Sequence, residues 1–226
     1  MIVRLHNLSA RPPVLSDVQA VTELMNACER AEVGVAHITE EEIESSWLAA
    51  GFMLRTDAWV IVTKKGQIVG YADARRSGEH QLTSLLRVHP NYLGRGIGTL
   101  LVWLTEERAR HLMRAIPVGQ RVTLINMVSS VNPRAKHLFQ REGYTLAHHY
   151  WNLAIRAEED MELPLYRRQQ HEVALVLDAQ NVAGAQNALA RTGVFTLHQY
   201  HVFEKELRPA AVMQFAQGLE TQCIIV

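Results

Sequence analysis

Cysteine is nearly absent from this 226-residue chain, which contains only Cys28 and Cys223. Two cysteines so far apart do not make the disulfide framework of a small secreted domain, so we expect a reducing, cytoplasmic setting. Neither sign of charge is in excess, because Lys and Arg together number 23 and so do Asp and Glu. This balance argues against a nucleic-acid partner and against binding to an anionic membrane surface.

Long apolar runs are also missing. No stretch is long enough to cross a bilayer, and the first residues lack the apolar core of a secretory signal, so we expect neither membrane insertion nor export. Hydrophobic residues nevertheless make up 48% of the chain, which is enough for a packed core. The length fits one full domain with a smaller one beside it.

The sequence shows no cluster of residues at the spacing of metal ligands, although the chain has 11 histidines. His148 and His149 are adjacent, so on a strand their side chains point to opposite faces, and the odd spacing of His198 and His201 has the same result. No cysteine or carboxylate cluster accompanies them at ligand spacing. We therefore expect no metal site.

Residues 82–104 contain a strand, a glycine-rich turn and a helix in close succession. An apolar run ends at Val88 and Pro90, glycines follow at 94, 96 and 98, and apolar residues then recur at helical spacing. Free N–H groups and the dipole at such a helix start favour an anion, and glycines let a phosphate approach the backbone. The G-x-G-x-G spacing is neither the dinucleotide fingerprint nor a P-loop. A turn that merely joins a core strand to a core helix is the alternative.

The run from Val88 to Leu101, V-H-P-N-Y-L-G-R-G-I-G-T-L-L, resembles the acetyl-CoA-binding signature of the GNAT superfamily of N-acetyltransferases. The segment from Asn132 to Tyr144, N-x-x-A-x-x-L-F-x-x-x-G-Y, resembles a second motif of that family. The resemblance implies acetyl-CoA as cosubstrate, with pantetheine along the strand and pyrophosphate on the loop amides. The cofactor-binding residues it implies are Leu86, Arg87, Val88, Gly94, Arg95, Gly96, Ile97, Gly98, Thr99, Asn132, Ala135 and Phe139.

Residues 1–156 read as β-α-α-β-β-β-α-β-α-β, an order that resembles the complete GNAT fold. The resemblance implies an α/β (α+β) fold with a mixed, mostly antiparallel sheet flanked by helices. The patterns predict strands at 2–6, 58–64, 67–75, 81–88, 122–128 and 144–155 and a long helix at 96–115. Capping boxes are predicted at Ser16–Gln19 and Thr39–Glu42, and an N-cap at Asn132. In the long helix, solvent-facing positions are predicted for Glu106, Glu107, Arg108 and Arg110.

The C-terminal part looks like a half repeat. Residues 173–179 echo 122–128, Ala185 and Gly193 echo the spacing of Ala135 and Gly143, and 194–207 alternate as a long strand. We therefore expect a GNAT domain at 1–160 and a partial repeat at 161–226, packed on the first domain or on a partner chain. The half repeat is compatible with a homodimer.

Three positions depart from the family's pattern. Leu93 stands where Arg or Gln is usual, Leu85 where many members carry a Glu that acts as base, and Phe139 where the general-acid Tyr sits. Glu79 is too far along the strand to replace that base. No catalytic residue is therefore assigned.

Two functions remain open at this stage. One is an N-acetyltransferase that acts on a primary amine of a small molecule or peptide, and the other is an acyl-CoA-binding sensor or interaction module with little catalysis. The acceptor is not legible in residues 7–15 or 30–56. The acidic run Glu40–Glu44 is read as a helix start that meets its dipole, with an acidic acceptor patch as the alternative.

Overall fold

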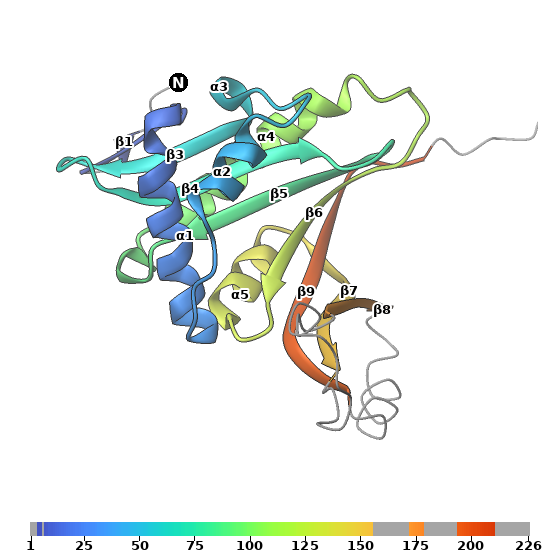
Figure 1. The fold of residues 1–226 in the computed structure, drawn as a ribbon. Helices are drawn as coiled ribbons and strands as arrows, with labels where there is room; N and C mark the ends of the chain where they lie inside the picture. Colours follow the sequence, from blue (N-terminus) through green and yellow to red (C-terminus); the bar gives the residue numbers. More distant parts are fainter. Residues whose placement is uncertain (1–3, 6, 156–171, 179–193, 211–226) are drawn as a thin grey trace, which may run out of the picture.

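The computed structural model describes residues 4–5, 7–155, 172–178 and 194–210. In this part of the chain one sheet of nine strands runs in the order β1-β2-β3-β4-β5-β6-β9-β7-β8, with helices on both faces (Figure 1). The strands are β1 Arg4–Leu5, β2 Leu8–Arg11, β3 Ala58–Thr63, β4 Ile68–Arg76, β5 Gln81–Val88, β6 Val122–Ser129, β7 Thr145–Ile155, β8 Glu172–Asp178 and β9 Val194–Arg208. Among the described pairs only β5 and β6 are parallel, so the expected mixed, mostly antiparallel sheet is confirmed.

The helices divide between the two faces of this sheet. They are α1 Val18–Val33, α2 Glu40–Trp47, α3 Leu54–Asp57, α4 Ile97–Met113 and α5 Pro133–Arg141, with short 3₁₀ turns η1 Leu15–Asp17 and η2 Pro90–Tyr92. Buried side chains of α1 and α2, such as Leu24 and Trp47, pack on Tyr71 of β4. Val102 of α4 and Phe139 of α5 belong to a second core cluster on other strands. Each helix therefore buries one apolar stripe on the sheet.

Most of the predicted local signals are confirmed. The Thr39 hydroxyl accepts from Glu42 N at 3.2 Å and the Glu42 carboxylate accepts from Thr39 N at 2.8 Å, which is the predicted capping box. Asn132 caps α5, with Oδ1 accepting from Ala135 N at 2.9 Å. A hairpin turn at Gly66, with φ of +84°, joins β3 to β4 as expected.

Near the N-terminus one prediction is confirmed in its described part and another is wrong. Of the strand predicted at 2–6, residues 4–5 form β1, which pairs with β2, and residues 2, 3 and 6 lie outside the described residues. β2 in turn carries the pairing with β3. The N-cap of α1 is Asp17 and not Ser16. The Asp17 carboxylate is held by the guanidinium of Arg11 at 2.6 Å and by Val14 N at 2.9 Å, so the turn before the helix is set by a contact to β2.

The solvent-facing positions predicted on α4 are wrong for Glu106 and Arg108. Glu106 is only 5% exposed, and its carboxylate accepts from Lys205 Nζ of β9 at 2.7 Å and from Arg110 at 3.0 Å. Arg108 Nε donates to the buried carboxylate of Asp57 at 2.6 Å. Helical spacing could not show these positions as buried, because their partners lie on distant segments.

The C-terminal half repeat is not confirmed. Residues 172–178 and 194–208 do form strands, as predicted. However, β9 pairs with β6 on one side and with β7 on the other, so it completes the sheet built by residues 4–155. The helix expected between these two strands and the domain boundary at residue 160 lie outside the described residues.

Candidate functional site

The parallel strands β5 and β6 separate at one end of their pairing. Their register runs from Gln81 opposite Thr123 to Ser84 opposite Asn126 and stops there. Beyond Ser84, β5 stays paired only with β4. Within the described part of the chain, the other edge of residues 85–88 is therefore not paired with a strand.

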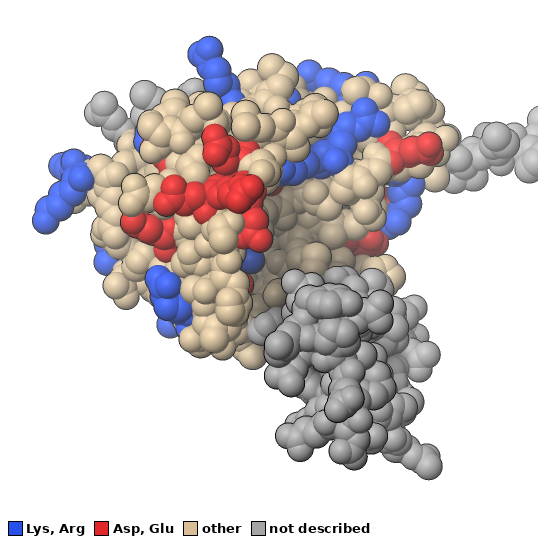
Figure 2. Space-filling view, viewed as in Figure 1, with Lys and Arg blue, Asp and Glu red and all other residues tan. Residues whose placement is uncertain are grey.

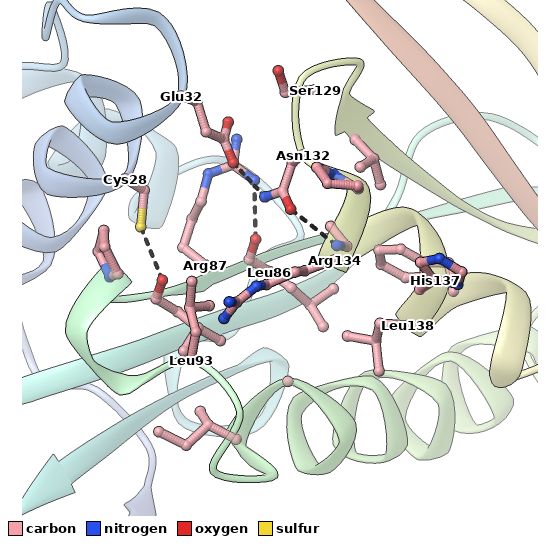
Figure 3. Close-up of a pocket in the computed structure, with 18 of the residues that line it drawn as sticks. Cys28, Glu32, Leu86, Arg87, Leu93, Ser129, Asn132, Arg134, His137 and Leu138 are labelled. Atoms are coloured by element: carbon pink, nitrogen blue, oxygen red, sulfur yellow. Dashed lines mark hydrogen bonds between the residues drawn. The ribbon is translucent and has the colours of Figure 1, made fainter.

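A cavity of about 970 Å³ occupies this gap (Figure 3). Its walls come from α1, the end of β5, the glycine loop, the first turn of α4, the end of β6 and α5. Of the residues expected to bind the cofactor, all but Arg95 line it: Leu86, Arg87, Val88, Gly94, Gly96, Ile97, Gly98, Thr99, Asn132, Ala135 and Phe139. The Arg95 guanidinium instead lies 4.7 Å from the centre of the Tyr92 ring. The structure thus brings these residues together, and their role in binding stays a prediction.

The open edge of β5 is identified by three backbone contacts. His89 N donates to Val69 O of β4 at 2.9 Å, so this residue faces the paired side. Leu86 O accepts from the Arg87 guanidinium at 2.9 Å, and Val88 O accepts from Cys28 Sγ at 3.3 Å, so both carbonyls face away from β4. Since residues alternate along a strand, the main-chain groups of 86 and 88 face the cavity.

The start of α4 leaves backbone donors without partners within the helix. Gly96 is the N-cap in a left-handed conformation, with φ of +79°, and no side chain caps this helix. The first helical hydrogen bond runs from Leu100 N to Gly96 O at 3.1 Å, so the N–H groups of residues 97–99 have no acceptor in the helix. A helix start of this kind favours an anion, as expected from the sequence, and binding of one here stays a prediction. A Cβ on Gly98 would come within 2.9 Å of Leu138, so glycine also lets α4 approach α5 closely.

A contact between α1 and α5 spans the cavity. Asn132 Nδ2 donates to Glu32 Oε1 at 2.6 Å, although the two residues are 100 positions apart (Figure 3). The sequence reasoning did not include Glu32 in the site. The sequence did contain a signal for this position. Glu32 lies one helical turn after Cys28, and therefore on the side of the helix that faces the sheet.

The positions that depart from the family's pattern carry no replacement groups of their own. Leu85 packs partly buried against the core beneath α1. Phe139 is buried, with its ring centre 5.0 Å from that of Tyr144. Leu93 lines the cavity with an apolar side chain that is 40% exposed. Neither the usual base nor the usual acid is present at these places.

The electrostatics of the cavity are mostly cationic. Arg87, Arg134 and Arg141 line it, and Arg141 also donates to Thr99 Oγ1 at 2.6 Å beside the start of α4. Burial raises the pKa of the Cys28 thiol to about 11, so this cavity residue stays protonated near neutral pH. In the described residues no group of three or more His, Cys, Asp or Glu side chains is placed to hold a metal ion, and no helix is long and apolar enough to span a membrane.

Comparison with known families gives one domain match. A family model described as an acetyltransferase (GNAT) domain matches residues 55–146, from α3 into β7. The match supports acyltransferase activity. No significant match is found among curated proteins.

Solved structures share the fold over most of the chain. A GCN5-related N-acetyltransferase from Sphaerobacter thermophilus superposes with a TM-score of 0.75 at 21% identity, covering 91% of this chain and 98% of that one. yncA from Salmonella typhimurium, solved with acetyl-CoA, gives 0.56 at 15% identity and covers 92% and 98%. A phosphinothricin acetyltransferase from Sinorhizobium meliloti, also with acetyl-CoA, gives 0.56 at 15% identity and covers 95% and 96%. At such identities these neighbours establish a common GNAT fold.

Proposed function

We propose that the GNAT acetyltransferase domain carried by this chain transfers an acetyl group from acetyl-CoA to a primary amine of a small molecule or a peptide. The observation that carries this proposal is the separation of β5 from β6 after Ser84, directly beside the uncapped start of α4. One cavity thereby joins an open strand edge to an anion site. Two neighbours of the same fold were solved with acetyl-CoA, which supports this choice of cosubstrate.

The residues of the cavity suit the parts of that cosubstrate. The N–H groups at residues 97–99 would hold the pyrophosphate, and Arg141 adds a positive charge beside them. The open edge at Leu86 and Val88 would pair with the pantetheine amides, as a strand would. The thioester supplies an activated acyl group. A backbone N–H on this edge would stabilise the negative charge that develops on the carbonyl oxygen during transfer.

The transfer makes two further demands on the protein. The acceptor must lose a proton, because an alkylammonium with a pKa near ~10.4 is not a nucleophile. The nitrogen then forms a bond to the acyl carbon, the carbon–sulfur bond breaks and CoA leaves with the electron pair. The nitrogen loses its second proton to water, which yields the neutral amide. A thiol with a pKa near ~8.5 can leave as thiolate, so the absence of a Tyr at Phe139 slows this step without abolishing it.

Calorimetric titration with acetyl-CoA and with CoA tests the binding site directly. We expect wild-type binding and its loss in Gly96→Asp, which places a carboxylate where the pyrophosphate would bind. Release of CoA thiol is then measured with a panel of primary amines. Tight binding without turnover of any amine would favour the acyl-CoA-binding module, and absence of binding would refute both functions.

A further inference from the structure

Glu32 is the only carboxylate among the described residues that line the cavity. It lies near the end of α1, and one of its oxygens, Oε1, is bonded to Asn132. Within the described part of the chain, no hydrogen bond or ion pair is found to its other oxygen, Oε2. Figure 3 shows the carboxylate beside Asn132 and close to the Arg87 side chain. One oxygen is therefore fixed by the protein, and the other is available to a ligand.

Glu32 belongs to the face of the sheet that is opposite the anion site. Tyr71 packs in the core under α1 and α2, and it pairs directly with Arg87 across β4 and β5. Directly opposed residues point to the same face, so Arg87 projects toward α1 and Glu32. The anion site at α4 lies on the other face (Figure 1). A cosubstrate held at α4 and threaded through the gap would present its acyl group toward Glu32.

We propose that Glu32 binds the ammonium group of the acceptor and takes up the proton that the amine loses. This inference rests on the proposed function. An N–H of the ammonium donates to Oε2, the proton passes to the carboxylate, and the neutral amine attacks the acyl carbon. CoA leaves as thiolate, the nitrogen gives its second proton to water to yield the neutral amide, and the proton on Glu32 is then released to water. The acceptor class is thus an amine that is cationic at the working pH.

Other groups near the gap do not fit this role. Asp73, directly across from Leu85, is 2% exposed and already bonded to the Tyr71 hydroxyl at 2.8 Å and to Arg75. Cys28 donates its S–H to Val88 O and is no base near neutral pH. His137 lies on α5, whose packing is with the cluster on the α4 face. Among the described residues that line the cavity, Glu32 alone combines a negative charge, an oxygen without a protein partner and the correct face.

The surface around this side of the cavity has the charge that such an acceptor requires. Figure 2 shows Asp and Glu side chains gathered over α2 and the neighbouring part of α1. The exposed glutamates at the start of α2 are Glu40, Glu41, Glu42 and Glu44. Their field attracts a cation toward the α1–α2 face of the sheet, the face to which Glu32 belongs.

The test compares Glu32→Gln with Glu23→Gln on the same helix. Gln at position 32 keeps an oxygen for the bond from Asn132, removes the charge and replaces the second oxygen by an NH2 group that can neither accept from the ammonium nor take up a proton. Glu23 is exposed and outside the cavity, so its variant controls for the loss of one carboxylate from α1. Each protein is assayed for acetyl-CoA binding by calorimetry and for CoA-thiol release with alkylamines, which are cationic, and with arylamines, which are neutral.

We expect Glu32→Gln to bind acetyl-CoA as wild type does and to lose about 100-fold or more in kcat/KM for alkylamines. Arylamine turnover should fall by less than about tenfold, and Glu23→Gln should behave as wild type. Undiminished alkylamine turnover in Glu32→Gln, or an equal loss for both amine classes, would overturn this inference and leave the acetyltransferase function standing. A wild type that acetylates no amine would instead remove the proposed function on which the inference rests.

Discussion

Replacing Gly96 by Ala separates the conformational role of this residue from its role in binding. Gly96 has φ of +79°, and a Cβ built there meets no atom within 4 Å. The destabilisation is therefore the cost of a left-handed backbone alone, about 1–2 kcal/mol. For a chain of this length that corresponds to a fall in Tm of roughly 2–8 °C. At the start of α4 the added methyl group would also crowd a pyrophosphate bound to the free N–H groups. Loss of one charge-assisted hydrogen bond, about 1.5–3 kcal/mol, would weaken acetyl-CoA binding roughly 10- to 100-fold.

Gly66 provides a matched control for this substitution. It lies in the β3–β4 turn with φ of +84°, and its Cβ also meets no atom within 4 Å. Gly66→Ala should therefore lower Tm by a similar amount and leave acetyl-CoA affinity unchanged. Thermal unfolding and calorimetric titration of both variants measure the two effects. Equal acetyl-CoA affinities in Gly96→Ala and Gly66→Ala would refute the assignment of the α4 start as the pyrophosphate site.

Three further outcomes are expected. Phe139→Tyr places a hydroxyl on a ring that lines the cavity, where it could protonate the departing CoA sulfur, and should raise kcat without changing acetyl-CoA affinity. An unchanged or lower kcat would show that a hydroxyl at this position does not act as a general acid. Lys205→Met removes one of the two cations that pair with the buried carboxylate of Glu106, leaving Arg110, and should cost about 1.5–3 kcal/mol in urea unfolding, largely restored by adding Glu106→Gln. Because burial raises the pKa of Cys28 to about 11, native Cys223→Ser protein should react with iodoacetamide at pH 8 at least ~100-fold more slowly than unfolded protein. The same raised pKa makes the free energy of unfolding depend on pH. The neutral buried thiol makes its full contribution to stability below pH ~9, and this contribution is lost as the pH rises toward 11 and the thiol ionises.

Local signals of the sequence predicted the elements that form the binding side of the cavity. The strand at 81–88, the glycine turn and the cap at Asn132 follow from patterns within about fifteen residues, and the structure shows each of them. The helix predicted at 96–115 begins one residue and ends two residues away from its observed bounds. Such features are decided by backbone conformation and by short-range hydrogen bonds, so they are legible without knowledge of the tertiary fold.

Features set by distant partners were not predictable in this way. The burial of Glu106 depends on Lys205, 99 positions away, and the contact of Glu32 depends on Asn132, 100 positions away. The position of β9 in the sheet is likewise set by segments that are distant in the sequence. Its alternation predicts a strand, but the choice of β6 and β7 as neighbours is a choice of topology that no local pattern encodes. The repeat-like spacing of residues 173–193 therefore suggested a second unit.

The loss of a carboxylate at Leu85 also has a structural reason. Leu85 is packed against the core beneath α1, and across β4 it faces Asp73, which is buried and paired with Arg75. A second carboxylate there would lie beside the first in a site of low dielectric, where two like charges are strongly disfavoured. Under the proposed function, a base for the acceptor must then come from another element that reaches the open end of the gap. α1 does so, since Glu32 reaches Asn132 across the cavity while the helix packs on β4. The same packing that excludes a Glu from β5 thus places one on α1.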